Sequence, residues 1–110
     1  CFRVLRHGGS LLAGFDNPII YIFDSDKFEK GIYEVRYSLP YSDLTSLDES
    51  ELQHRIDEGW PLEFSHTLHE QIGGQIEAGF ALTGFYEDID PESPFSQYTP
   101  IYIATCATKL

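Results

Sequence analysis

The stretch PLEFSHTLHEQIGGQIEAGFALTGFYED, residues 61–88, sets out a strand end, a helix and a second strand in immediate succession. Thr67 and Glu70 stand three residues apart before apolar side chains at helical spacing, which predicts a capping box at the helix start. Gly79 predicts the stop, because glycine readily adopts the left-handed conformation that closes a helix. Residues 81–86 are apolar and aromatic enough to predict a strand. A helix that runs directly into a strand is typical of α/β proteins.

Further strand patterns flank this stretch. Residues 10–15, SLLAGF, are almost continuously apolar, which predicts a strand covered on both faces, as in a parallel sheet. Residues 101–108 are apolar and β-branched, and they predict a final strand antiparallel to residues 81–86. Three prolines and four acidic residues in positions 87–100 predict a loop between those two strands. Basic residues followed by glycines in positions 2–9 predict the last turn of a helix.

Residues 19–66 predict a small antiparallel insertion. Positions 33–39 alternate between apolar or aromatic and polar side chains, which predicts a strand with one face in water. Residues 62–66 predict a second strand that pairs with it. The polar residues 24–31 predict a turn or a single helical turn. Insertions of this kind commonly cover a site.

A second helix is predicted inside the insertion, over residues 46–59. Ser46 and Glu49 have the spacing of a capping box at its start. Leucine and isoleucine four residues apart then follow on one face, and Gly59 predicts the stop.

Length and charge narrow the classes of function. A length of 110 residues and a content of 42% hydrophobic side chains predict one domain with a hydrophobic core. Its 18 acidic and 7 basic residues give a net charge of −11, which repels phosphate backbones, so we expect neither nucleic acid nor an anionic membrane as a partner. No apolar run approaches the roughly 20 residues that span a bilayer, and no leader pattern opens the chain. The expected location is the cytoplasm.

The cysteines and the first residue bear on the origin of the chain. Cys1 and Cys106 are too few for a disulfide scaffold, and Cys106 lies in an apolar stretch, where we expect a small hydrophobic side chain. The chain contains no Met and begins at Cys1. We therefore expect an internal piece of a longer protein.

Three segments occur in an order that resembles class I S-adenosylmethionine-dependent methyltransferases. FRVLRHGGSLLAGF, residues 2–15, resembles the family's R-V-L-x-P-G-G-x-L-L segment, with His7 in place of the usual Pro. FSHTLHEQIGGQIEAGFALTGFYED, residues 64–88, resembles the segment in which a helix ending in A-G-F feeds the sixth strand. IYIATCATK, residues 101–109, resembles the seventh strand.

The resemblance implies an α/β fold, namely the C-terminal part of a Rossmann-like methyltransferase sheet. Strands five, six and seven and a helix would come from residues 1–18 and 67–110, within one partial domain. Residues 19–66 would form a small antiparallel insert that covers the substrate side. The implied reaction is transfer of a methyl group, and we expect a small-molecule acceptor.

The same resemblance implies S-adenosylmethionine as cofactor in the parent protein. The family holds it with a glycine-rich loop after the first strand and an acidic residue after the second, and neither is present here. No G-x-G-x-G occurs, and Gly73 and Gly74 fall inside a predicted helix. We therefore expect no cofactor bound to this fragment and no activity from the fragment alone.

Three polar residues are candidates for chemistry. His66 stands at the strand-to-helix junction, where it either serves as the catalytic base or caps the helix or packs beneath the insert. Alignment of donor and acceptor accounts for much of such catalysis, so a base is not required. Asp16 and Asn17 follow the first strand and are either substrate contacts or turn residues.

The aromatic side chains of the insertion suggest a binding site for the acceptor. Tyr21, Tyr37 and Trp60 could line a pocket, or they could form the insertion's own core together with Tyr33. We expect no metal site, since the pair of histidines at positions 66 and 69 lacks a third ligand at a fixed spacing.

Two alternatives to an isolated methyltransferase fragment remain open. One is a free-standing α+β binding or interaction module without catalysis. The other concerns assembly, because the strand over residues 10–15 would expose its edge and could pair with a second copy as a homodimer.

Overall fold

The computed structural model describes all 110 residues and divides into two compact units. The first unit contains Cys1–Ile20 and Leu68–Leu110, and the second contains Tyr21–Thr67. The second unit therefore interrupts the first in the sequence. None of the helices in either unit has the length and apolar character that crossing a bilayer requires.

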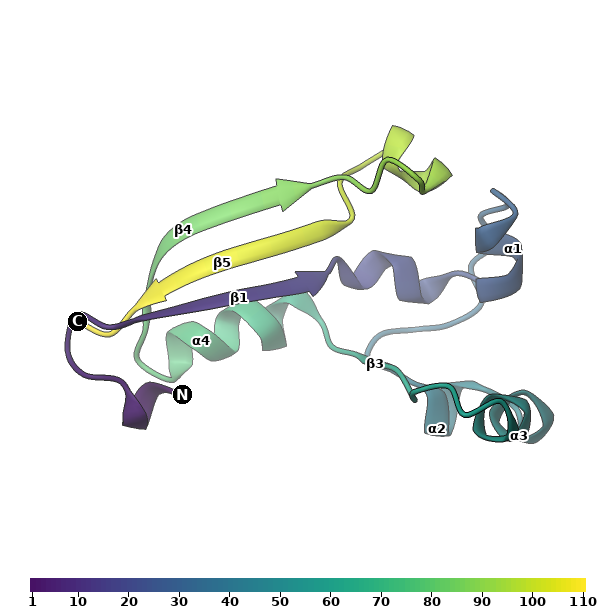
Figure 1. Ribbon diagram of the computed structural model, residues 1–110, viewed down its shortest axis with the longest axis horizontal. Helices are drawn as coiled ribbons and strands as arrows, with labels where there is room; N and C mark the ends of the chain where they lie inside the picture. Colours follow the sequence, from purple (N-terminus) through teal and green to yellow (C-terminus); the bar gives the residue numbers. More distant parts are fainter. The chain divides into compact units, whose positions relative to one another are not determined.

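The first unit is built on a three-stranded sheet with the order β1-β5-β4 (Figure 1). Its strands are β1 (Ser10–Asp16), β4 (Ala81–Asp88) and β5 (Tyr102–Thr108). Both pairings are antiparallel. The three strands predicted from the sequence are confirmed, as is the antiparallel pairing of the last two.

The parallel sheet predicted for the first strand is not formed among these 110 residues. β1 pairs antiparallel with β5, and exposed and part-buried residues alternate along it. Leu12 is 78% exposed. Within these 110 residues, one face of β1 is therefore exposed.

The predicted helix consists of a π-helical turn, His69–Gly73, that continues as α4 (Gly74–Glu77). It begins with Leu68 in the N-cap position, so Thr67 lies one residue before the position that the capping box assigned to it. Gly79 ends the helix at φ 111°, as predicted. The chain then enters β4 directly.

The core of the first unit lies between the sheet and this helix. Ile101, Ile103, Thr105 and Ala107 alternate along β5 and the residue before it, and all four are buried. Thr105 Oγ1 donates to Gln75 Oε1 at 3.1 Å, which joins the centre of the sheet to α4.

The N-terminal segment packs against the end of the helix. Residues Phe2–Val4 form a 3-10 turn, and the ring of Phe2 meets that of Phe80 edge to face at 5.1 Å. Lys109 Nζ donates to the carbonyl oxygen of Phe2 and lies 4.4 Å above its ring. The loop predicted over residues 87–100 contains one short 3-10 turn, Pro94–Gln97.

The second unit is made of short elements. Its helices are α1 (Ser25–Glu29), α2 (Asp43–Ser46) and α3 (Glu49–Asp57), and its two strands are β2 (Tyr41–Ser42) and β3 (Phe64–Ser65), which pair antiparallel. A 3-10 turn, Pro18–Ile22, leads into it. The single helical turn predicted over residues 24–31 is confirmed by α1.

The strand predicted over residues 33–39 is wrong. That segment makes one isolated bridge, between Phe23 and Val35, and β3 pairs with β2 instead. The backbone N–H groups of Arg36 and Tyr37 both donate to the carbonyl oxygen of Ile22, so the backbone does not form a ladder there. The alternation that suggested a strand arises because side chains on opposite sides of an irregular segment have different partners.

The cap predicted for the second helix is also wrong, although its stop is confirmed. Ser46 is the last residue of α2, and α3 begins at Glu49 with Asp48 as its N-cap. Asp48 Oδ1 accepts from the backbone N–H of Glu51 at 2.8 Å. Gly59 follows the helix at φ 71°.

Candidate functional site

A buried tyrosine and a buried carboxyl group form the centre of the second unit. Tyr41 lies in β2, and Asp43, the first residue of α2, is fully buried. The hydroxyl of Tyr41 donates to one oxygen of Asp43, and the backbone N–H of Glu63 donates to the other at 2.7 Å. Asp43 N–H donates in turn to the carbonyl oxygen of Glu63 at 3.0 Å. The carboxyl group therefore accepts from one donor close in the sequence, Tyr41, and from one distant in the sequence, Glu63.

Two of the aromatic candidates pack on this centre. The ring of Tyr21 lies 5.5 Å from that of Tyr41, and the ring of Tyr37 meets it edge to face at 5.1 Å. Burial raises the pKa of Tyr41, and its hydrogen bond to Asp43 raises that pKa further. Burial also raises the pKa of Tyr37. Both phenols are therefore suited to donate a hydrogen bond rather than to act as a base near neutral pH.

Arg36 connects the start of α1 to α3. Its Nη1 lies 3.2 Å from Asp24 Oδ2, and its Nη2 lies 2.5 Å from Glu51 Oε1. The hydrogen bond to Glu51 raises the pKa of Arg36, which stays a cation. The guanidinium carbon also lies 5.0 Å from the centroid of the Tyr37 ring. The hydroxyl of Tyr37 is buried without a hydrogen-bond partner, so this ring is held by its contacts with Arg36 and Tyr41.

The third aromatic candidate, Trp60, lies in a different setting. It is 51% exposed, and its ring meets that of His54 edge to face at 5.5 Å. It borders a groove of about 430 Å³ across which Arg55 Nη2 donates to Ser25 Oγ at 3.3 Å. The groove is lined by Ser25, Asp26, Glu29, Arg55, Trp60, Pro61 and Glu63. Tyr21 and Tyr37 thus share a cluster around Tyr41, and Trp60 faces a groove.

The polar candidates belong to different units. His66 is exposed and follows β3 in the second unit. Asp16 ends β1 in the first unit, and Asn17 follows it. Asn17 Oδ1 accepts from the backbone N–H of Ile19 at 3.1 Å, and Asn17 N–H donates to the carbonyl oxygen of Ile101 at 2.7 Å. Asn17 therefore makes a turn of the kind its residue type favours.

Nowhere in the chain do three His, Cys, Asp or Glu side chains come together in an arrangement that would hold a metal ion.

Sequence reasoning missed Tyr41 and Asp43. The segment PYSD, residues 40–43, is too short to show a periodic pattern, and an aspartate after a serine looks like an ordinary turn residue. Their importance comes from the contact with Glu63, twenty positions away. No local signal could have revealed that contact.

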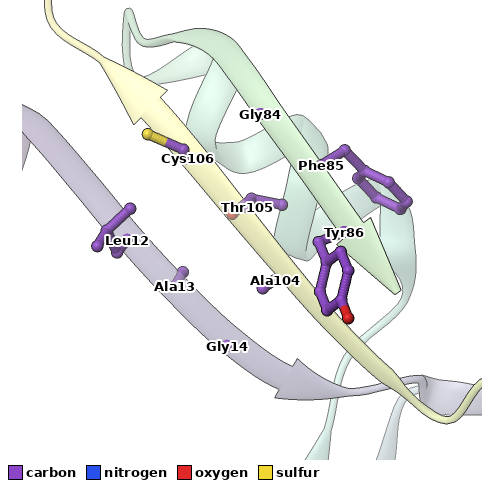
Figure 2. Close-up of a pocket in the computed structure, with 9 residues that line it drawn as sticks. All are labelled: Leu12, Ala13, Gly14, Gly84, Phe85, Tyr86, Ala104, Thr105 and Cys106. Atoms are coloured by element: carbon purple, nitrogen blue, oxygen red, sulfur yellow. The ribbon is translucent and has the colours of Figure 1, made fainter. Parts of the chain in front are cut away.

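The open face of the first unit's sheet forms a shallow apolar depression of about 470 Å³ (Figure 2). Its floor is made of small residues and is flanked by Leu12 on β1 and Tyr86 on β4, which is 63% exposed. The floor residues that share this face are Gly14, Gly84, Ala104 and Cys106. An apolar depression of this kind offers contact area and very few polar groups for chemistry.

No family model matches the chain. Over 109 residues, 99% of its length, the chain is 40% identical to a protein of Bacillus subtilis (strain 168) described as "Uncharacterized methyltransferase YbaJ". The chain spans 42% of the length of that relative. The resemblance to part of a methyltransferase, reached from three short segments of sequence, is therefore confirmed across almost the whole chain.

Proposed function

We propose that these 110 residues are the C-terminal part of a class I S-adenosylmethionine-dependent methyltransferase that acts on a small-molecule acceptor. The observation that carries the proposal is the 40% identity over 99% of the chain, because it spans the sheet and the insertion alike. The succession of a strand, an insertion, a helix and two antiparallel strands supports it. β1, β4 and β5 would be strands five, six and seven.

The residues present do not fit the cofactor by themselves. The family's glycine-rich loop follows its first strand, whereas β1 would be the fifth and is followed by the Asn17 turn and Pro18. The glycines with positive φ, at positions 8, 31, 59 and 79, lie in turns or at helix ends. Binding of S-adenosylmethionine therefore requires the rest of the parent protein, and the isolated chain is inactive.

In the parent, residues 19–66 are the insert that contacts the acceptor. Tyr21, Tyr37 and Trp60 supply apolar contact area for the acceptor, and Asp16 and Asn17 lie where the chain leaves β1. His66 acts as the base that takes a proton from the acceptor as the methyl group arrives. The buried Tyr41–Asp43 pair fixes the backbone at β2 and β3, and His66 directly follows β3.

A chimeric protein tests the assignment. The matching segment of the Bacillus subtilis relative is replaced by these 110 residues, and S-adenosylhomocysteine is titrated by calorimetry into the chimera and into the isolated chain. We expect binding to the chimera and none to the isolated chain. Micromolar binding to the isolated chain, or a folded chimera that binds nothing while the intact relative does bind, would contradict the proposal.

The role of His66 is tested in the same chimera. Release of S-adenosylhomocysteine is followed with pooled small-molecule alcohols, phenols and amines as acceptors. His66→Ala should reduce turnover on an active pool by about 100-fold or more, which is the usual contribution of a general base. His69→Ala, three residues further along, is the matched control and should leave turnover unchanged. Equal turnover in the two variants would remove His66 from the mechanism.

A further inference from the structure

The groove beside Trp60 is built entirely from residues of the second unit. Its lining comes from α1, from Arg55 on α3 and from the segment that follows α3. Arg36 bonds both to Asp24, the N-cap of α1, and to Glu51 on α3, which ties the two helices to each other. The shape of the groove is therefore set within this unit alone.

Trp60 is presented to the groove by the end of α3. Gly59 ends the helix, and the backbone N–H of Trp60 still donates to the carbonyl oxygen of Arg55 at 3.0 Å. Pro61 follows and restricts the backbone on the other side. The indole ring is half exposed, and it also lines a smaller recess of about 150 Å³ that shares Arg55 with the groove. A half-exposed indole on a constrained backbone offers a flat π surface to a ligand.

The charge of the groove is negative. The carboxylates of Asp26, Glu29 and Glu63 line it, against the single guanidinium of Arg55. Arg55 donates to Ser25 Oγ, and the ion pairs of the structure include neither Asp26 nor Glu29, which are exposed residues. The second unit as a whole has eleven acidic and four basic residues. An anionic ligand would therefore be repelled from this groove, and a cation would be attracted to it.

The arrangement of these groups favours an organic cation over a metal ion. The carboxylates do not come together in a set that would hold a metal, so they act on a ligand through their charge. The face of a tryptophan ring attracts cations, and quaternary ammonium groups are commonly recognised in this way. The groove volume of about 430 Å³ lies within the range of about 300–1,000 Å³ that is typical of small-molecule sites.

We propose that this groove binds the quaternary ammonium group of a small organic molecule. The ring of Trp60 contacts the alkyl groups on the charged nitrogen, and Asp26, Glu29 and Glu63 supply the negative potential. A quaternary nitrogen has no lone pair to accept a methyl group, so an acceptor bound here carries this group away from its reacting atom. That statement about the acceptor rests on the proposed function, whereas the affinity of the groove for the cation does not.

Trp60, the single tryptophan, reports directly on the groove by its fluorescence. Choline is titrated into the 110-residue chain, and so is the neutral alcohol in which a carbon atom replaces the nitrogen of choline. We expect choline to produce a saturable change with a dissociation constant in the millimolar range, and the neutral alcohol to bind about tenfold more weakly. Equal affinities for the two compounds, or no saturable change with choline, would overturn the proposal.

A matched pair of substitutions tests whether the charge of the groove itself attracts the ligand. Glu29→Gln removes one carboxylate from the groove and should raise the dissociation constant of choline about threefold, without changing that of the neutral alcohol. Asp57→Asn removes the same charge from an exposed residue of α3 that does not line the groove, and it should leave both constants unchanged. Equal losses in the two variants would show that the net charge of the unit attracts the cation, which contradicts a site in the groove.

Trp60→Leu tests the ring, with binding followed by saturation-transfer NMR of the choline methyl groups because this variant lacks its fluorophore. Binding should weaken about tenfold, and an unchanged affinity would exclude the ring from the site. The same measurement in the chimera separates this inference from the proposed function. A chimera that binds choline but not S-adenosylhomocysteine would contradict the methyltransferase assignment alone, and the reverse result would contradict the ammonium site alone.

Discussion

Each of the two units is stabilised internally by a different kind of hydrogen bond. The first has strands of seven or eight residues, joined by continuous backbone ladders. The second has strands of only two residues, and side chains provide many of its long-range connections. Asp43 joins β2 to the segment before β3, and Arg36 joins α1 to α3. The hydrogen bonds of a backbone ladder depend little on side-chain identity. We therefore expect single substitutions to lower the stability of the second unit more than that of the first.

The largest effect should follow Asp43→Ala. The change leaves the buried hydroxyl of Tyr41 and the part-buried N–H of Glu63 without their acceptor, at a cost of about 3 kcal/mol in the free energy of unfolding. Trp60, the single tryptophan, reports on the second unit by its fluorescence during urea unfolding. Hydrogen exchange of the β5 amides reports on the first unit and should change far less.

The matched control for this prediction is Asp57→Ala. Asp57 is exposed and accepts one hydrogen bond, from Gln53 Nε2. Its removal should change the free energy of unfolding by less than about 0.5 kcal/mol. An equal loss of stability in the two variants would contradict the prediction. So would a loss of hydrogen-exchange protection at the β5 amides as large as the loss of stability in the second unit.

The next effect concerns Gly79, which ends the helix of the first unit. Gly79→Ala should destabilise by about 2 kcal/mol, because φ is 111° and the added Cβ would lie 2.8 Å from Phe2 Cζ. Gly74→Ala, at φ −61° and with no atom within 4 Å of the added Cβ, should be neutral or slightly stabilising. Thermal unfolding of the two variants provides the measurement. A stability loss in Gly74→Ala as large as that in Gly79→Ala would contradict the assigned helix stop.

The smallest effect is a pH dependence confined to the second unit. The hydrogen bond from Lys27 N–H lowers the pKa of Asp24, and Arg36 lowers it further, while partial burial opposes both. A carboxyl whose folded pKa is depressed stabilises the fold above its unfolded pKa, and the stabilisation is lost as the pH falls through the folded value. We expect a loss of about 1 kcal/mol or less below about pH 4.

Asp24→Asn isolates that contribution. Asparagine retains the capping acceptor for Lys27 N–H but does not titrate over this range. The difference in free energy of unfolding between the two proteins, followed by Trp60 fluorescence from pH 6 to pH 3, should shrink as the pH falls. A difference that stays constant or grows would show that Asp24 does not stabilise the second unit through its charge.

Most of the first unit could be predicted from the sequence. Its strands are long enough to show apolar and aromatic runs, and Gly79 marks a backbone conformation that other residues adopt with difficulty. In the second unit the α1 turn, a helix that ends at Gly59 and a strand within residues 62–66 were predicted, but the pairing of that strand and the cap of α3 were not. The alternation over residues 33–39 matched a strand, but Arg36 and Tyr37 both bond to Ile22 and find separate side-chain partners.

The candidate site could likewise be predicted from the sequence only in part. Tyr21, Tyr37 and Trp60 could be named from their residue type and their position in the insertion, but their arrangement could not. Tyr41 joins the first two into a cluster, and Trp60 borders a separate groove. Tyr21 and Tyr41 are too far apart in sequence for a local pattern to reveal their contact, and Tyr37 precedes Tyr41 in a segment without regular structure.

The sequence by itself determined the strands of the first unit, the glycine stops and the resemblance to part of a methyltransferase. These follow from side-chain periodicity and backbone conformation, which are properties of neighbouring residues. Only the tertiary structure decided that β1 lies antiparallel to β5, and that Asp43 is buried between Tyr41 and Glu63. Those features depend on which distant segments satisfy each other's hydrogen-bonding groups, and a buried polar group stabilises the fold only when such a partner is found.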